Sequence, residues 1–115
     1  TARHHAETAL ELAEKVGAPL LVGAALRVLA MAVIAGAPAD PDRGGPRELL
    51  DRATEVLGAI GAELELGRVL LTYAEYEERG GRVSVASALR GQATQIRVRA
   101  FGGPNGASLP EVVAT

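Results

Sequence analysis

The sequence has 115 residues, of which 48% are hydrophobic and 23% are charged, and its formal net charge is −2. This length fits one small domain or a segment of a larger protein, and the composition is typical of a folded, globular chain. There are 22 Ala residues, whereas Ile, Phe, Tyr and Trp together number 6. The composition therefore favours closely packed helices over a β-sandwich.

Other properties of the composition exclude several classes of protein. A chain with a slight acidic excess lacks the positive charge that direct nucleic-acid binding needs. With no Cys there is no disulfide framework and no thiolate metal site. The basic residues are 11 Arg and one Lys, a bias that, with the abundant Ala and Gly, indicates a GC-rich bacterial gene. Because position 1 is Thr and not Met, we interpret the chain as a segment of a longer protein.

Five helices are predicted from the apolar spacing and the Gly and Pro stops. The first carries an apolar stripe that includes Leu10 and ends at Val16, before Gly17 and Pro19. The next four are predicted at residues 20–35, 47–60, 63–79 and 84–101, the last with Ser84 as its N-cap. Residues 16–39 contain one charged residue, Arg27. A charge near the middle disfavours a membrane span, so we predict no contact with a membrane.

An internal repeat organises these helices. Gly17-Ala18 aligns with Gly61-Ala62 at an offset of 44, and Ala53-Thr54-Glu55-Val56 recurs 40 residues later as Ala93-Thr94-Gln95-Ile96. The difference lies in a Pro/Gly-rich insertion at residues 36–46. The predicted units are a half repeat (1–17), a repeat with the inserted loop (18–61), a second full repeat (62–101) and a flexible tail or linker (102–115).

These units resemble tetratricopeptide-like repeats in their longer variety of about 40 residues. The match rests on Tyr73-Ala74 in the first helix of the last unit, on the turn glycine Gly81, and on the small residues Ala86 and Ala93 in the second helix. The sequence departs from the family at Arg90, where a bulky apolar residue is usual, and lacks the closing proline. The resemblance implies an all-α right-handed superhelix of antiparallel helix pairs, that is, an α-solenoid of about five helices.

The resemblance also implies a binding groove lined by the first helix of each pair. The matching positions include Ala24 and also the candidate partner-binding residues Arg27, Met31, Ile34, Arg68, Leu71, Glu75 and Glu78. The two arginines are expected to hold a carboxylate of a bound peptide, while Met31, Ile34 and Leu71 take side chains. The alternative is that other repeats of the parent protein cover this face.

No catalytic motif is present, so the chain is predicted to be no enzyme and to need no cofactor and no metal. His4-His5 lack companion ligands, and Asp40, Asp42 and Asp51 fit an EF-hand frame poorly because Arg47 stands at an apolar position. A run of Glu at 75, 77 and 78 is typical of a solvated helix face. Four arginines, Arg82, Arg90, Arg97 and Arg99, indicate either ion pairs with the acidic fourth helix or an anion site.

The repeat and the lack of a catalytic motif predict a cytoplasmic scaffold for protein–protein or inter-domain contact. The family resemblance implies that it is part of a larger bacterial signalling or transcription-regulatory protein. Its partners are a protein, a peptide or other domains of the parent chain, with no direct nucleic-acid binding. Two alternatives stay open. One is a helical accessory subdomain of an enzyme such as a kinase, cyclase or ATPase, and the other is a self-associating module that forms a homo-oligomer.

Overall fold

The computed structural model describes residues 1–102, and within them the chain is all-α, as predicted, without strands. The helices are α1 (Ala2–Val16), α2 (Pro19–Ile34), α3 (Pro46–Ala59), α4 (Glu63–Arg79) and α5 (Val83–Arg97), and a π-helical turn, Val98–Gly102, continues α5. All five predicted helices are confirmed. Of the predicted tail, residues 103–115 lie outside the described part.

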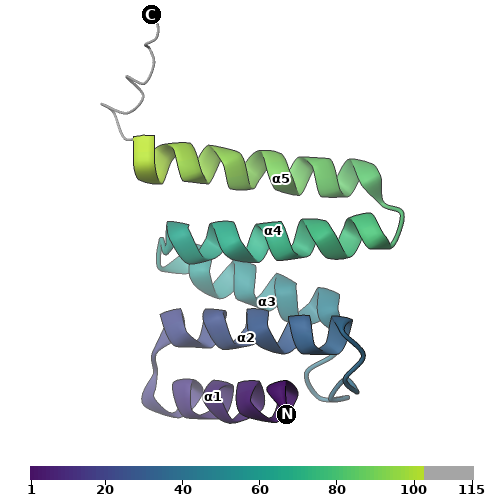
Figure 1. Cartoon of the computed structure of the whole chain (residues 1–115). Coiled ribbons are helices and arrows are strands. Elements are labelled where there is room, and N and C mark those ends of the chain that lie inside the picture. The colour runs from purple at the N-terminus through teal and green to yellow at the C-terminus, as the bar shows by residue number, and fades with distance from the viewer. Residues whose placement is uncertain (103–115) are drawn as a thin grey trace, which may run out of the picture.

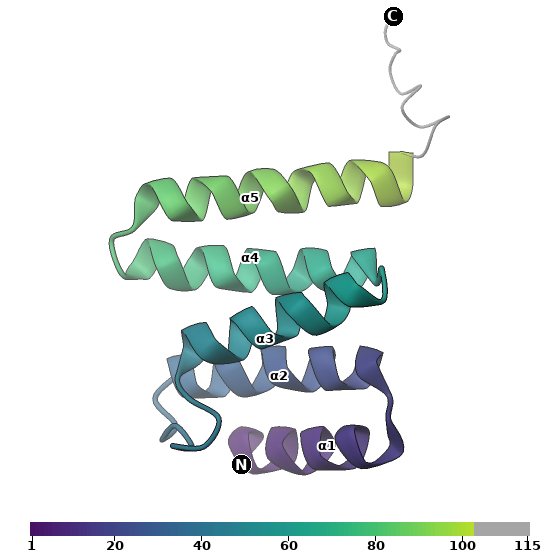
Figure 2. The same cartoon turned by 180° about the vertical axis from the view of Figure 1, so that it is seen from behind.

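The helices form one stack in which each runs back along its predecessor, from α1 at one end to α5 at the other (Figure 1). Helix α3 lies behind α2 and α4 in Figure 1 and in front of them in Figure 2, so that α2 contacts both α3 and α4. The inserted loop joins α2 to α3. This arrangement places α2 and α4, the first helices of the two predicted units, beside each other on one face.

Glycines end the second helix of successive units at equivalent positions. Gly17 after α1 and Gly61 after α3 are 44 residues apart, and both adopt left-handed backbone angles, with φ of 70° and 67°. Residues with a Cβ rarely adopt this conformation, which lets the last helical carbonyls find donors. The expected N-cap at Ser84 was wrong. Helix α5 begins at Val83, which places Ser84 inside the helix.

Small residues fill the contacts between helices, as the repeat alignment predicts. Five alanines at the aligned positions are all buried, with 0 to 4% of their surface exposed: Ala30, Ala53, Ala74, Ala86 and Ala93. The main core lies among α1, α2, α3 and Val69 of α4, and a smaller cluster of Leu70, Ala93 and Ile96 holds α5. Alanines at these positions let helix backbones approach closely, so that each layer packs against the next.

One acidic side chain departs from the predicted solvated face. Glu77 is 2% exposed. Arg47, in the first turn of α3, donates from Nε and Nη2 to the two carboxylate oxygens at 3.1 Å each, and Arg82, just before α5, also pairs with this carboxylate. Both guanidinium groups lie over the Tyr76 ring, at 5.9 and 5.8 Å from its centroid. A single carboxylate on α4 therefore connects α3 with the start of α5.

The two arginines also set the ionisation of Glu77. Burial alone raises the pKa of this carboxyl group, but the hydrogen bonds from Arg82 and Arg47 outweigh burial and leave the pKa below its usual value. A carboxyl group whose folded pKa is lowered stabilises the fold above its unfolded pKa of about 4.3, and this contribution disappears as the pH falls through the folded pKa.

We predict that Glu77→Gln lowers the free energy of unfolding at neutral pH by about 1–2 kcal/mol, because the charged hydrogen bonds from both arginines are weakened or lost while the half-exposed arginines regain water. Urea denaturation measures the change. The variant is also expected to lose less stability than the wild type between neutral pH and about pH 3. The exposed Glu75, changed to Gln, is the matched control, and an equal loss in both variants would contradict the role of Glu77.

The two full repeats differ in how tightly their helices approach. On α2, a Cβ added to Gly23 would lie 2.4 Å from Cδ2 of the buried Leu57 on α3. On α4, a Cβ added to the equivalent Gly67 would meet only Cγ2 of Ile96, at 4.0 Å. The first pair therefore requires a glycine for close packing, whereas the second has room for a methyl group.

The same substitution is expected to have opposite effects in the two repeats. Gly23→Ala should destabilise the chain by about 1–3 kcal/mol because Leu57 must move, whereas Gly67→Ala should stabilise it by up to about 1 kcal/mol through helix propensity. Thermal unfolding of both variants measures the difference. Equal shifts in the same direction would show that the two helix pairs pack alike.

Candidate functional site

The predicted groove residues of α2 and α4 lie on neighbouring helices and meet at one end of that face. A cavity of about 230 Å³ lies between the C-terminal half of α2 and α4, and its lining includes Met31, Ile34, Glu75 and Arg79. Three of the seven predicted partner-binding residues are thus together around one hollow. Their mixture of apolar walls and charged groups fits a peptide side chain better than a reaction centre.

The other predicted groove residues are placed differently. Arg27 folds along its own helix, with Nη1 at 3.3 Å from Sδ of Met31, and its buried Nε has no hydrogen-bond acceptor among the described residues. Arg68 donates to Glu65 at 2.7 Å, one turn away on α4. Glu78 pairs with Arg90 of α5. The two predicted carboxylate-binding arginines, Arg27 and Arg68, therefore each contact a side chain of their own helix.

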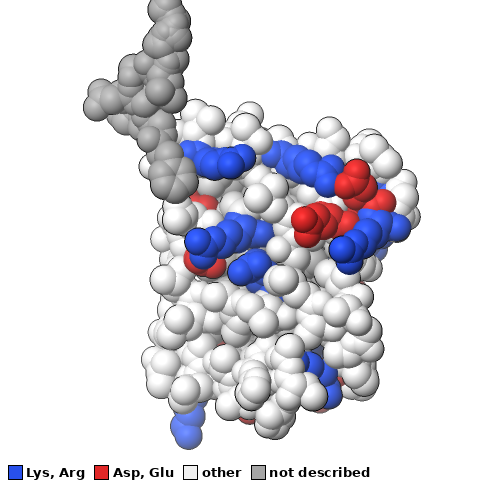
Figure 3. Space-filling model, viewed as in Figure 1, with Lys and Arg blue, Asp and Glu red and all other residues white. Residues whose placement is uncertain are grey.

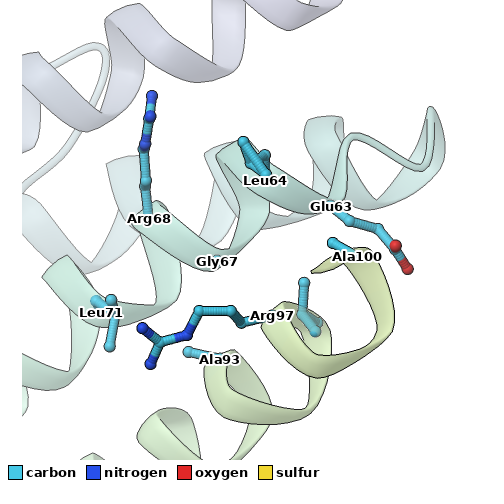
Figure 4. A pocket seen from close by; sticks show the side chains of 9 residues that line it. Glu63, Leu64, Gly67, Arg68, Leu71, Ala93, Arg97 and Ala100 are labelled. Carbon is cyan, nitrogen blue, oxygen red and sulfur yellow. The ribbon is translucent and has the colours of Figure 1, made fainter. Parts of the chain in front are cut away.

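A second hollow, of about 180 Å³, lies between α4 and α5 and contains Arg68 and Leu71 in its lining (Figure 4). In Figure 4 the Arg68 side chain points away from α5, whereas Arg97 extends from α5 across toward Leu71. The groove prediction did not include Arg97 or the apolar floor formed by Ala93 and Ile96. The repeat alignment contained a signal for Arg97, because it places this arginine at the position that the buried Leu57 occupies in the preceding unit.

The largest of the three hollows described was not predicted and lies at the first end of the stack. An open groove of about 620 Å³ runs between α1 and α2. Its lining residues are apolar except for one histidine: Ala2, His5, Ala6, Ala9, Leu12, Ala13, Val16, Leu21, Ala24, Ala25 and Val28. Leu12 is 60% exposed, Val16 64% and Leu21 57%. We call this surface the α1/α2 groove.

Charged side chains also gather over the last two helices (Figure 3). On the face shown in Figure 3, acidic and basic groups lie together over α4 and α5, and the visible surface over α1 and α2 is mostly uncharged. Of the four arginines in the basic stretch, Arg82 pairs with Glu77, Arg90 with Glu78 and Arg99 with Glu63. Ion pairing with α4, one of the two interpretations of this stretch, is thus observed for three of them.

The side chains of Glu77 and Tyr73 have shifted pKa values. A general acid needs a raised pKa, whereas the pKa of Glu77 is lowered. Burial, followed by a hydrogen bond donated to Asp51 at 2.6 Å, raises the pKa of Tyr73 and so keeps its hydroxyl protonated. Asp51, the last residue of the EF-hand frame, lies within α3 and accepts that bond.

Within residues 1–102, no group of three or more His, Asp or Glu side chains is placed to hold a metal ion. No helix in this part of the chain has the length and apolar character required to cross a bilayer.

Comparisons with protein-family models, with curated protein sequences and with solved structures found no match to this chain. The assignment of a function therefore depends on the geometry of the surfaces described above.

Proposed function

We propose that this chain is a non-enzymatic helical-repeat scaffold that binds a helix of another protein or domain, within a larger bacterial signalling or transcription-regulatory protein. In this proposal the stack is part of a right-handed, tetratricopeptide-like superhelix. The observation that supports it best is the α1/α2 groove. Exposed apolar patches of this kind mark interaction surfaces. The internal repeat indicates that the partner element in this groove is a helix.

The internal repeat supplies a template for the partner. Leu12 on α1 aligns with Val56 on α3 at the offset of 44. Val56 packs against the core, whereas Leu12 is 60% exposed. Helix α2 contacts both α3 and α4, and the corresponding place beside α1 and α2 is the open groove. A helix with the character of α2, with Gly and Ala among branched apolar residues, therefore suits the α1/α2 groove.

The exposed side chains provide enough apolar surface to drive such an association. Complete burial of one Val or Leu side chain contributes about 1.5–3 kcal/mol, and Leu12, Val16, Leu21 and Val28 are each 41 to 64% exposed. Covering all four therefore contributes several kcal/mol, part of which offsets the loss of translational and rotational freedom on binding.

Self-association is a second candidate, favoured by one feature of α1. Its groove positions Ala2, His5, Ala9, Leu12 and Val16 follow spacings of 3 and 4, which is the pattern of a coiled-coil seam. Two copies of the chain can therefore pair through α1. The α2/α4 cavity with Met31, Ile34 and Glu75 remains a predicted second contact for a peptide.

A peptide with the sequence of α2, residues 19–34, extended by terminal lysines for solubility, is the appropriate probe for the groove. We predict that it shifts the methyl NMR signals of Leu12, Val16, Leu21 and Val28, and that Leu12→Glu weakens binding at least about tenfold by placing a charge in the apolar contact. Ser87→Glu, at an exposed position of α5 outside the groove lining, is the matched control and should bind as the wild type does.

Light scattering over a range of concentrations separates the two candidates. A monomer that binds the peptide supports the helix-binding scaffold, and a dimer that Leu12→Glu dissociates supports self-association. A monomer whose groove methyl signals do not respond to the peptide contradicts both.

A further inference from the structure

At the pocket between α4 and α5, the two aligned helix pairs differ at the position that Leu57 occupies in the first pair. The offset of 44 relates Gly23 on α2 to Gly67 on α4, and the offset of 40 relates α3 to α5, pairing Ala53 with Ala93 and Leu57 with Arg97. Both alanines are buried. Leu57 is also fully buried, whereas Arg97 is exposed.

This difference leaves an apolar space of defined size. In the first pair the Leu57 side chain lies directly against Gly23. In the second pair no leucine occupies the space beside Gly67, and a hollow of about 180 Å³ remains, with Leu64, Leu71, Ala93 and Ile96 among its walls (Figure 4). The space is therefore suited to a branched aliphatic group like the one that fills it in the first pair.

Arg97 is the charged residue of this pocket that has no ion-pair partner among the described residues. Glu63 pairs with Arg99 at 3.1 Å, and Arg68 pairs with Glu65 at 2.7 Å. Within the described residues Arg97 forms no ion pair, unlike Arg82, Arg90 and Arg99 in the same stretch of sequence. Its side chain extends across the pocket toward Leu71 (Figure 4). A free guanidinium at an apolar pocket is a preferred partner for a carboxylate, to which it can donate two parallel hydrogen bonds.

We propose that the α4/α5 pocket binds a carboxylate carried on a branched aliphatic group, with the aliphatic part beside Gly67 and the carboxylate on Arg97. Two sources present this chemistry. One is a small branched-chain carboxylic acid, and the other is the C-terminal residue of a peptide that ends in Leu, Ile or Val. The site lies at the opposite end of the stack from the α1/α2 groove, so it does not depend on the helix-binding proposal.

The test is an NMR titration of the full 115-residue chain with two probes, 4-methylpentanoate and an acetylated tripeptide ending in leucine with a free carboxylate. At least one probe should shift the signals of Gly67, Ala93 and Ile96. The probe that binds identifies the source of the carboxylate. The corresponding uncharged amide should bind at least roughly tenfold more weakly, and so should the acid to Arg97→Gln, because each change removes the charged hydrogen bonds.

Two glycine variants separate loss of the pocket from a change in the helices. Gly67→Ala adds a methyl group to the pocket wall without a clash and should weaken binding. Gly91→Ala, on α5 with open space around it, raises helix propensity equally and should leave binding unchanged. The proposal is overturned if neither probe shifts these signals at millimolar concentration, if Arg97→Gln binds as the wild type does, or if both glycine variants weaken binding equally.

Discussion

Each helix of this chain buries its apolar side against neighbouring helices of the stack, and this constraint governs the rest of the structure. Alanines at the contacts let the helices approach closely, and Gly23 does the same where Leu57 of α3 packs against α2. Because burial depends on a neighbour, an end of the stack without one leaves its apolar side exposed. The α1/α2 groove is that side, which is why it is both the largest hollow and the most apolar surface described.

The two ends of the stack differ in chemistry. At the α1 end the α1/α2 groove is apolar and suited to another helix, while Glu14 of α1 pairs with Arg43 and Arg52 outside the groove lining. At the α5 end, arginines and glutamates bind one another across α4 and α5, and the buried Glu77 also holds the first turn of α3 through Arg47. Several arginines and glutamates at the α5 end therefore have ion-pair partners within the described residues. Arg97 is the exception in its basic stretch. The distribution suggests that the α1 end associates with a partner helix and that the α5 end recognises a small, charged group.

The sequence was sufficient to predict the helices, the inserted loop and the buried alanines, because these depend on local spacing and on Gly and Pro stops. It was insufficient for Glu77, since a run of Glu has the same pattern whether it is solvated or buried. The burial of this residue depends on Arg47, 30 positions earlier, and on Arg82 in the next turn. The α1/α2 groove was missed because small residues such as Ala2 and Ala9 conceal the regular spacing that ends in Leu12 and Val16. Among the predicted groove residues, Met31, Ile34 and Glu75 line one cavity, whereas Arg68 and Glu78 bind side chains on α4 and α5, which sequence spacing does not reveal.

The central claim is that the α1/α2 groove accepts a helix in the manner in which α3 and α4 accept α2. Isotope-filtered NOE measurements on the labelled chain with the unlabelled α2 peptide test it most directly. The account predicts contacts from the peptide to the methyl groups of Leu12, Val16, Leu21 and Val28, with the peptide helical and lying along α1. Contacts confined to α4 and α5, or a peptide without contacts to the groove, would contradict it.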